Sequence, residues 1–278
     1  GNLDILPFNN VMIEHYCAQI DFKNKFDAVK LDFRHQLPEN MLKNHAYILA
    51  CGHAEKPYIQ DPVYKKKITA SYVFVHGTSD SDGYLDIPIL KEDDFIKYNP
   101  ETHGHFKSDV ARIGIAEAAS ISTCSAYGIA SDYFRNNPKE LPVIHDSRRA
   151  RYSGSINVLT RNGVKSVQVN SVQVEIDGFW EYKDLIIPLE GKAYSYEDLS
   201  NPNARPNISW RQLAYLIEYT TKETQAIQSK KGLRFSLVGE VRPHPFGNKR
   251  AFYIVEFKGS RVRSEEHTSE LQSRITIS

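Results

Sequence analysis

The chain has 278 residues, of which 41% are hydrophobic and 25% are charged, so wholesale disorder is excluded and one large domain or two small ones fit. The formal net charge is only +1, but it is unevenly spread. Residues 1–140 carry 15 Lys and Arg against 19 Asp and Glu, whereas residues 141–260 carry 17 against 12. A mildly basic second half is compatible with a polyanionic partner.

The first half of the chain mixes strand-like and helix-like segments. Tyr47–Cys51 and Ile68–Val75 are rich in β-branched and aromatic residues, which predicts two strands. Residues 109–134 predict a pair of helices with a break near Gly128. We therefore expect residues 1–140 to form a mixed α+β region.

A β-hairpin is predicted near the start of the second half. Ser155–Thr160 and Val167–Ile176 are its strand candidates, and Arg161-Asn162-Gly163 between them carries the Asn-Gly pair typical of a type I′ turn. The apolar alternation of the second strand slips at Asn170-Ser171, which predicts a β-bulge.

The next segment combines a buried strand with polar connections. Residues 178–184 are expected to form a turn, and residues 194–207 a polar loop. Between them, Leu185–Leu189 is apolar on both faces, which is typical of an internal strand covered on both sides. Two more strands are predicted at Arg234–Val241 and Ala251–Phe257.

A helix is predicted from Ser209 to about residue 221. Its apolar face has the spacing i, i+3, i+4, i+7, and its polar face lies opposite. The apolar positions are Trp210, Leu213, Ala214 and Ile217, and the opposite ones are Arg211, Tyr215 and Glu218. The order of elements predicts an α/β protein, α+β overall, in which residues 146–260 form a central mixed sheet flanked by helices.

Residues 261–278 look foreign to this pattern. They show no apolar periodicity, and Arg263–Ser273 resembles the peptide obtained when a sequencing adapter is translated. We expect a non-native tail, with a genuine disordered tail as the alternative.

The location of the protein is predicted from features that the sequence lacks. No stretch approaches the about 20 apolar residues that span a bilayer, and the first residues lack the pattern of a signal peptide. Cys17, Cys51 and Cys124 are odd in number and fit neither a disulfide framework nor a Cys-x-x-Cys metal site. We therefore expect a cytoplasmic protein with no membrane partner.

Three charged residues near two predicted strand ends form the candidate site. Asp177 ends one strand and, twelve residues later, Glu190 ends an otherwise apolar one. Lys192 lies two positions beyond Glu190, so the two side chains face the same way in an extended backbone. If the two strands are neighbours, the connection between them brings Asp177 beside this pair.

Two carboxylates and an ammonium suit a hard divalent cation. Mg²⁺ binds through one or two carboxylates, waters and substrate phosphate, and Mn²⁺ is an expected substitute. Such a cation lowers the pKa of a bound water and neutralises charge on a phosphate oxygen. Lys192 is suited to stabilising the same charge. The pattern therefore predicts hydrolysis of a phosphodiester, with Asp177 and Glu190 as metal ligands.

The spacing Asp177-x12-Glu190-x-Lys192 resembles the PD-(D/E)xK nuclease superfamily, although no Pro precedes Asp177. Over roughly residues 146–257, the chain is similar to one group of type II restriction endonuclease-like proteins. The segments that carry this resemblance are Arg149–Ile156, Val174–Gly178, Leu189–Lys192 and Trp210–Leu213. The chain departs from the pattern of that group at three places, with Gly191 for Ala, Arg148-Arg149 for Gly-Arg, and Ile156 for Phe.

The resemblance implies a restriction-endonuclease-like core and Mg²⁺-dependent cleavage of double-stranded DNA. It implies Asp177 and Glu190 as metal ligands and Lys192 as an assisting catalytic residue. Gln212, at the start of the helix that follows the site, is a further catalytic candidate that could orient the attacking water or the lysine, and the alternative is an ordinary polar helix face. The resemblance also implies a homodimer and, in the host, a cognate DNA methyltransferase. Residues 1–140 would then take part in DNA recognition. The spacing of the predicted helices beside strand-like segments suggests a winged-helix-like portion in residues 105–140.

Basic residues near these motifs are candidates for binding DNA. Arg149, Arg151 and Arg211 are placed to contact phosphates, and Lys65-Lys66-Lys67 forms a further basic group. Glu175 shares a strand face with Asp177 and is a candidate ligand for a second ion. The alternative for each is an ordinary solvent-facing position, and the alternative for Asp177 is a simple Asp-Gly turn.

Three other functions remain open at this point. The first is a repair or junction-resolving nuclease. The second is a DNA-binding protein whose nuclease site has decayed, with Gly191 as an early sign. The third uses Asp177 and Glu190 as a glycosidase pair, which needs an aromatic sugar platform that neither Trp180 nor Trp210 clearly supplies.

Overall fold

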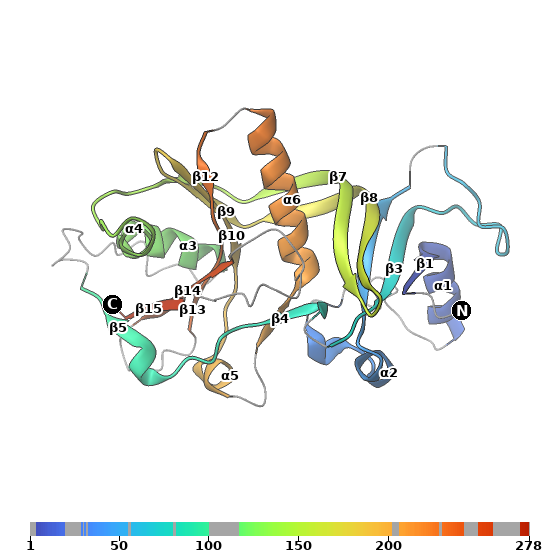
Figure 1. Cartoon of the computed structure of the whole chain (residues 1–278), viewed down its shortest axis with the longest axis horizontal. Coiled ribbons are helices and arrows are strands. Elements are labelled where there is room, and N and C mark those ends of the chain that lie inside the picture. The colour runs from blue at the N-terminus through green and yellow to red at the C-terminus, as the bar shows by residue number, and fades with distance from the viewer. Residues whose placement is uncertain are drawn as a thin grey trace.

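The computed structural model describes residues 4–19, 29, 31, 33–54, 57–79, 82–99, 117–201, 206–227, 230–241, 250–257 and 273–277. Helices and strands are interspersed along the chain, so the protein has the mixed α/β class that the sequence predicts. Two large sheets lie beside each other along the long axis, and one long helix stands between them (Figure 1).

A five-stranded mixed sheet forms one side of the molecule. Its order is β1-β3-β2-β8-β7, in which β2 and β8 are parallel and the other neighbours are antiparallel. Its strands are β1 (Ile5–Asn9), β2 (Ala46–His53), β3 (Ala70–His76), β7 (Arg148–Thr160) and β8 (Gly163–Ile176). The predicted ranges 1–140 and 146–260 therefore share one sheet, and the division into domains at this point stays a prediction.

An eight-stranded mixed sheet forms the other side. Its order is β5-β15-β14-β13-β10-β9-β6, and β12 also pairs with β10. Its strands are β5 (Phe95–Lys97), β6 (Val143–His145), β9 (Gly178–Glu181), β10 (Leu185–Gly191), β12 (Gly232–Leu233), β13 (Phe235–Glu240), β14 (Ala251–Phe257) and β15 (Ser273–Ile277). Of the tail predicted at residues 261–278, only β15 falls within the described residues.

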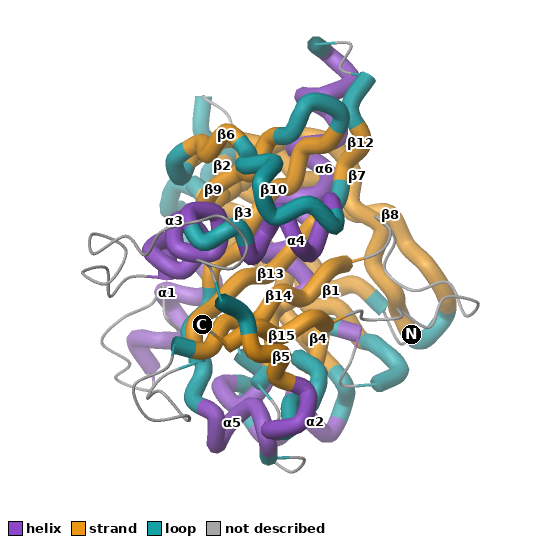
Figure 2. Tube along the Cα trace, turned by 90° about the vertical axis from the view of Figure 1, so that its left-hand side faces the viewer, coloured by secondary structure: helices purple, strands orange, loops and turns teal. Residues whose placement is uncertain are grey.

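The helices complete the layers around these sheets. They are α1 (Asn10–Gln19), α2 (Glu39–Lys43), α3 (Glu117–Ala126), α4 (Ile129–Arg135), α5 (Tyr196–Ser200) and α6 (Trp210–Ala226). A small two-stranded sheet joins β4 (Tyr84–Asp86) to β11 (Asn207–Ser209). Helices α3 and α4 lie against the sheet that contains β9 and β10 (Figure 2), whereas α6 packs between the two large sheets.

Alternating side chains of the eight-stranded sheet enter two different cores. Ile187 and Leu189 of β10 are fully buried in a cluster with Ile121 of α3. Leu237 of β13 belongs to the other cluster, which includes Leu213 of α6 and extends into the five-stranded sheet. The sheet is therefore covered on both faces, which confirms the prediction that Leu185–Leu189 is an internal strand.

Both strands of the predicted hairpin are present, but each begins earlier than predicted, β7 at Arg148 and not at Ser155, and β8 at Gly163 and not at Val167. The predicted bulge is confirmed. The register of β7 against β8 shifts between Tyr152 and Gly154, opposite the predicted bulge at Asn170-Ser171. A type I′ turn needs a positive φ at both central residues. The positive φ here belongs to Gly163, at +98°, and not to Asn162. The predicted type I′ turn is therefore wrong, and the glycine instead follows the turn.

Several element boundaries also differ from the prediction. Residues 178–181 form β9, so the predicted turn is shorter and covers only residues 182–184. The predicted loop at residues 194–207 contains α5, whose first turn is capped by Ser195. The break predicted near Gly128 is confirmed between α3 and α4, whereas residues 105–116, which begin the predicted helix pair and the winged-helix-like portion, lie outside the described residues.

The helix predicted at residues 209–221 is confirmed and extends to Ala226. Ser209 caps it, because its side chain accepts a hydrogen bond from the Arg211 amide at 3.3 Å. The prediction placed Tyr215 on the polar face, but this side chain is buried and its hydroxyl donates to the carbonyl of Ala50. The reason is that the five-stranded sheet covers this flank of the helix.

Candidate active site

Asp177 is the single residue between β8 and β9, and its carboxylate is held against β10. Strand β9 pairs antiparallel with β10 so that Gly178 lies opposite Leu189. The backbone amide of Asp177 donates to the Leu189 carbonyl at 3.2 Å. In return, the Gly191 amide donates to Asp177 Oδ2 at 2.7 Å. These two bonds bring the Asp177 carboxylate beside the end of β10.

Glu190 and Lys192 form a buried ion pair at that strand end. Lys192 Nζ lies 2.8 Å from Glu190 Oε1, and their side chains are only 13% and 7% exposed, respectively. A buried carboxylate is costly unless a counter-charge and hydrogen bonds compensate it. Lys192 supplies that counter-charge in a site largely removed from water.

The backbone of Lys192 is fixed from two sides. Its amide donates to the Val238 carbonyl at 3.0 Å, and its carbonyl accepts a hydrogen bond from the Tyr253 hydroxyl at 2.6 Å. Gly239 packs so closely here that a Cβ on it would lie 1.9 Å from the Lys192 carbonyl oxygen. The position of the lysine thus depends on strands β13 and β14 as well as on β10.

Gln212, in the first turn of α6, completes the group. Its Nε2 donates to Glu190 Oε1 at 3.3 Å. Its Oε1 is buried and has no hydrogen-bond partner among the described residues. Turning the amide over would set two acceptor oxygens against each other, so this orientation is the favoured one. An acceptor that needs a partner therefore remains for a water or a ligand.

The side chains of the predicted site line one cavity of about 500 Å³. Asp177, Glu190, Lys192, Gln212 and Arg211 belong to its lining. The sequence placed these five residues in one site, and the structure brings them together around a common space. Cavities of this size are typical of ligand sites.

Another part of the cavity wall comes from the first half of the chain. Gly52 and His53 of β2 and Ser71 and Tyr72 of β3 line it. Burial raises the pKa of Tyr72, and the nearby charge of Arg211 opposes that rise. Sequence reasoning missed this wall, because only the pairing of distant strands brings β2 and β3 here.

Gly52 allows this wall to approach β8. It is the residue at which β2 pairs with β8, opposite Asn170. A Cβ on Gly52 would lie 1.7 Å from the Asn170 carbonyl oxygen, and the φ of Gly52 is +108°. Both the contact and the left-handed backbone therefore require glycine at this position.

Arg149 and Arg151, which were predicted to contact DNA phosphates, lie on β7 and do not line the cavity. Arg149 stands opposite Glu175 and Arg151 opposite Gln173, so both share a sheet face with cavity-lining residues. Arg149 Nε lies 3.4 Å from Glu175 Oε1, and Arg151 Nη1 donates to the Ser171 carbonyl at 2.9 Å. The structure thus brings Arg211 into the site and leaves Arg149 and Arg151 beside its rim.

The donors of the cavity suit a hard cation. Among the described residues, no group of three or more His, Cys, Asp or Glu side chains is arranged to hold a metal ion. The cavity offers the carboxylates of Asp177 and Glu190. Mg²⁺ is commonly held by one or two carboxylates together with waters and substrate phosphate, whereas a structural zinc site needs four protein ligands. The residues present therefore fit Mg²⁺.

Comparisons with protein-family models, with curated proteins and with solved structures found no match. In the parts of the chain that the structure describes, no helix combines the length and the apolar character needed to cross a membrane. The function is therefore inferred from the side chains of the cavity and from the motifs that surround them.

Proposed function

We propose that the protein is a Mg²⁺-dependent endonuclease that hydrolyses phosphodiester bonds of double-stranded DNA, as a type II restriction enzyme does. The observation that carries this proposal is the convergence of Asp177, Glu190 and Lys192 on one cavity. The eight-stranded sheet with helices on both faces supports a restriction-endonuclease-like core. In a restriction system the enzyme would act in the cytoplasm beside a cognate methyltransferase.

Asp177 and Glu190 would hold the cation. Mg²⁺ held there would act as a Lewis acid, which would neutralise charge on the phosphate and make water easier to deprotonate. The Gly191 amide orients the Asp177 carboxylate, so the glycine that replaces the usual alanine does not disturb the pair.

Lys192 and Gln212 would act on the reacting groups. The Lys192 ammonium can donate to a phosphate oxygen as negative charge builds up on it. The Gln212 Oε1 acceptor can orient the attacking water, since it lacks a partner among the described residues. Water adds to phosphorus and loses a proton, one bridging P–O bond breaks, and the released oxygen takes up a proton.

Arg211 would bind a phosphate of the DNA backbone. It lies at the amino-terminal end of α6, where the helix dipole also favours an anion. Arg149 and Arg151 on the neighbouring β7 would extend this basic surface along the strand. Their role would be to position the duplex and not to take part in the chemistry.

The test is incubation with unmethylated DNA of high sequence complexity, with Mg²⁺, with Mn²⁺ or with EDTA, followed by sequencing of the ends. Cleavage at a defined sequence is expected with either metal and not with EDTA. Asp177→Asn retains an oxygen that can accept the Gly191 hydrogen bond but removes the charge, so it should bind DNA without cutting it. Cleavage that persists in this variant, or wild-type protein that binds but never cuts, would contradict the proposal.

Metal binding can be measured without activity. A ligand that binds only the folded state raises the melting temperature. Mg²⁺ should raise the melting temperature of the wild type and have a smaller effect on Asp177→Asn. An equal shift in both proteins would show that the cation does not bind at this carboxylate.

A further inference from the structure

Tyr72 is a polar side chain of the cavity to which the proposed chemistry gives no role. It lines the cavity from β3 and lies opposite Ala50 of β2, which is another lining residue. Residues directly opposite each other on neighbouring strands share a sheet face. The next residue along β3, Val73, is buried in the core on the other face. Tyr72 therefore belongs to the face that carries the cavity.

The ring of Tyr72 is held in place, whereas its hydroxyl is available. The ring stacks on Phe8 of β1 with the two centroids 5.3 Å apart, and Phe8 also stacks on Phe74 at 4.5 Å. The hydroxyl makes no hydrogen bond within the part of the chain that the structure describes. Because a partly buried tyrosine hydroxyl usually has a partner, this one is placed to bind a ligand in the cavity.

Helix α6 brings a cation to the same place. The Tyr215 hydroxyl donates to the carbonyl of Ala50, which fixes the helix to the residue opposite Tyr72. Arg211 precedes Tyr215 by four residues and so lies on the same side of α6. Burial raises the pKa of Tyr72 and of Tyr215, and the charge of Arg211 acts against that rise in both. The guanidinium thus lies near both hydroxyls.

A guanidinium and a neighbouring hydroxyl together favour an anion. The Arg211 side chain offers five N–H donors, and the protonated Tyr72 hydroxyl offers one more. The same cavity holds Lys192 with Asp177 and Glu190, where the proposed function places the scissile phosphate. Each nucleotide of a strand carries a phosphate, so a strand bound there presents a second phosphate beside the first.

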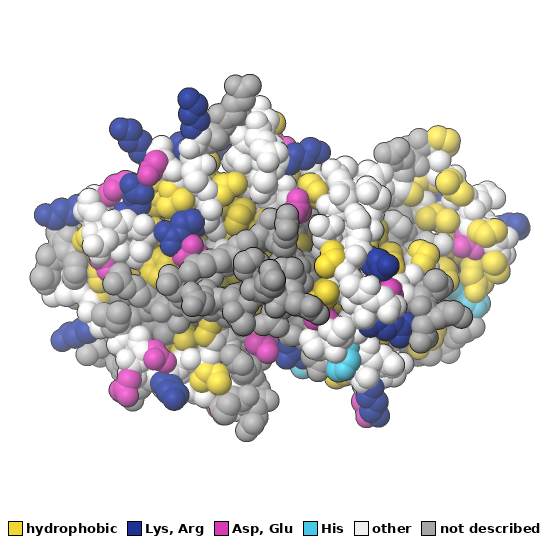
Figure 3. Space-filling model, viewed as in Figure 1, with side chains coloured by type: hydrophobic (Ala, Val, Ile, Leu, Met, Phe, Trp, Pro, Cys, Tyr) yellow, Lys and Arg dark blue, Asp and Glu magenta, His cyan; other side chains and the backbone are white. Residues whose placement is uncertain are grey.

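The charge of the surface does not by itself position a strand. Interfaces with DNA are strongly positive as a rule. On the face drawn in Figure 3, however, the Lys and Arg side chains of the described residues are scattered among acidic and uncharged ones. Individual donors inside the cavity are therefore needed to hold the strand in register.

We propose that Tyr72 and Arg211 form a phosphate subsite, which binds an uncleaved phosphate next to the one that Asp177 and Glu190 process. The Tyr72 hydroxyl donates to one non-bridging oxygen, and the Arg211 guanidinium donates to another. No bond of the substrate changes at this subsite. The inference rests on the proposed function for the identity of the anion, and it adds a substrate-binding residue from the first half of the chain.

The first experiment measures binding of a fluorescent DNA duplex by anisotropy in EDTA, so that it does not depend on cleavage. Tyr72→Phe keeps the ring on Phe8 but removes the hydroxyl, and the dissociation constant should rise about 10-fold. The matched control is Tyr219→Phe, because this half-buried ring packs against the core, makes no hydrogen bond among the described residues and does not line the cavity. The control should bind as the wild type does. Equal binding by Tyr72→Phe and wild type overturns the subsite.

The salt dependence of binding separates a direct contact from a general disturbance. Arg211→Gln should lower the slope of log Kd against log salt by about one, since one fewer cation neutralises the backbone. Tyr72→Phe should weaken binding with the slope of the wild type, because the lost donor is neutral. A lower slope in Tyr72→Phe would mean that the change acts by displacing a charged side chain, which contradicts the proposed contact.

A third experiment locates the phosphate. Single phosphates of the duplex are replaced by uncharged methylphosphonates, and wild-type affinity should fall most at one position beside the cleaved bond. The same replacement should weaken Tyr72→Phe less, because its hydroxyl contact is already gone. Equal losses in both proteins overturn the subsite. A protein that shows these effects but never cuts contradicts the nuclease alone, and one that cuts while Tyr72→Phe binds normally contradicts the subsite alone.

Discussion

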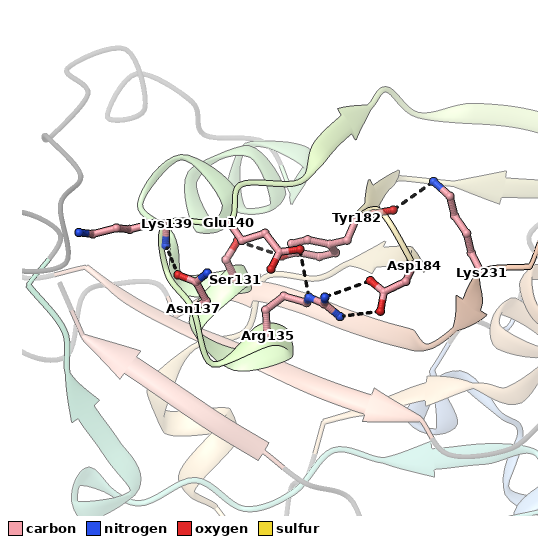
Figure 4. Close-up of polar contacts among 8 residues, drawn as sticks. All are labelled: Ser131, Arg135, Asn137, Lys139, Glu140, Tyr182, Asp184 and Lys231. Carbon is pink, nitrogen blue, oxygen red and sulfur yellow. Dashed lines mark hydrogen bonds and ion pairs between the residues drawn. The ribbon is translucent and has the colours of Figure 1, made fainter.

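The hairpin of β9 and β10 carries a charged cluster at each end, and the surroundings of the two clusters differ. At the turn end, Arg135 binds Glu140 at 3.2 Å and Asp184 at 3.0 Å, and Lys231 contacts the Tyr182 carbonyl at 3.1 Å (Figure 4). The Asp184 side chain is 63% exposed. These contacts connect α4, the turn of the hairpin and Lys231, which immediately precedes β12.

The other end of the hairpin holds Asp177, Glu190 and Lys192. There the carboxylate of Glu190 is almost fully buried but faces a cavity, and the nearby Gln212 has a buried acceptor without a partner among the described residues. A collection of charges does not by itself mark a site, because both ends have one. The end that holds Asp177, Glu190 and Lys192 faces a cavity and has a buried acceptor without a partner among the described residues, whereas the turn end has a mostly exposed acid, Asp184.

The largest expected effect on DNA cleavage comes from replacing the lysine at the cavity end, compared with the lysine at the turn end. Lys192→Met removes the ammonium from the cavity and leaves Glu190 without its counter-charge, so DNA cleavage should fall by about 100-fold or more. Lys231→Met breaks a partly exposed pair that contributes about 0–1 kcal/mol, and cleavage should change by less than about 5-fold. Initial rates on a short duplex containing the cleavage site would measure both. Equal losses in the two variants would remove the distinction between the ends.

Glycines at the two ends should also respond differently. A Cβ at Gly239 would meet the Lys192 carbonyl oxygen at 1.9 Å and the Tyr253 hydroxyl at 2.1 Å, so Gly239→Ala should lower the free energy of unfolding by about 1–3 kcal/mol. The nearest atoms to a Cβ at Gly232 lie 3.7 Å away, and Gly232→Ala should change it by less than about 0.5 kcal/mol. Urea unfolding measures both variants, and a neutral Gly239→Ala would show that the strands yield easily.

A smaller effect is expected from the unpartnered acceptor. Gln212→Ala removes one neutral hydrogen bond to the attacking water, so kcat should fall by about 5- to 10-fold. Gln173→Ala is the control, since this residue lines the same cavity but bonds to Glu175 at 2.7 Å. Single-turnover rates with saturating enzyme would separate the chemical step from binding. A loss that appears only in binding would assign Gln212 to holding DNA.

The smallest expected effect is a pH dependence of the free energy of unfolding that arises at the turn end. Hydrogen bonds from Lys231, and then from His145, lower the pKa of Glu181 below its usual 4.5. Because the folded-state pKa is the lower one, the stabilisation is present above about pH 4.5 and is lost as the pH falls through the folded value. Glu181→Gln should therefore have a free energy of unfolding up to about 1 kcal/mol below that of the wild type at neutral pH, and the two proteins should be equally stable at acidic pH. A difference that persists in acid would contradict this assignment.

Local patterns predicted most elements of the second half. The slip in alternation located the bulge at Asn170-Ser171, because a two-residue period leaves no other place for an extra residue. The short β9 was missed, since four residues that begin with glycine resemble a turn. A signal for α5 was present, because Ser195 and Asp198 have the spacing of a capping pair.

The sequence predicted the charged residues of the candidate site but not the strands that enclose them. The spacing of Asp177, Glu190 and Lys192 suggested a shared strand end, although the contact is made through β9 and not by β8 pairing with β10. His53 and Tyr72 carry no local signal for the site, because their place depends on the pairing of β2 with β8. Tyr215 was misplaced for the same reason, since periodicity cannot show which sheet covers a helix flank.

Gly52 on β2 pairs with Asn170 on β8, so the cavity is complete only after both parts of the chain have been synthesised. Strands β2 and β3 leave the ribosome well before Asp177, so one wall of the cavity waits for the residues that complete it. A fragment that starts at residue 146 would retain the Asp, Glu, Lys and Arg side chains of the cavity but would lack the wall that β2 and β3 form. A nascent chain would therefore lack the complete cavity until α6 has emerged and docked.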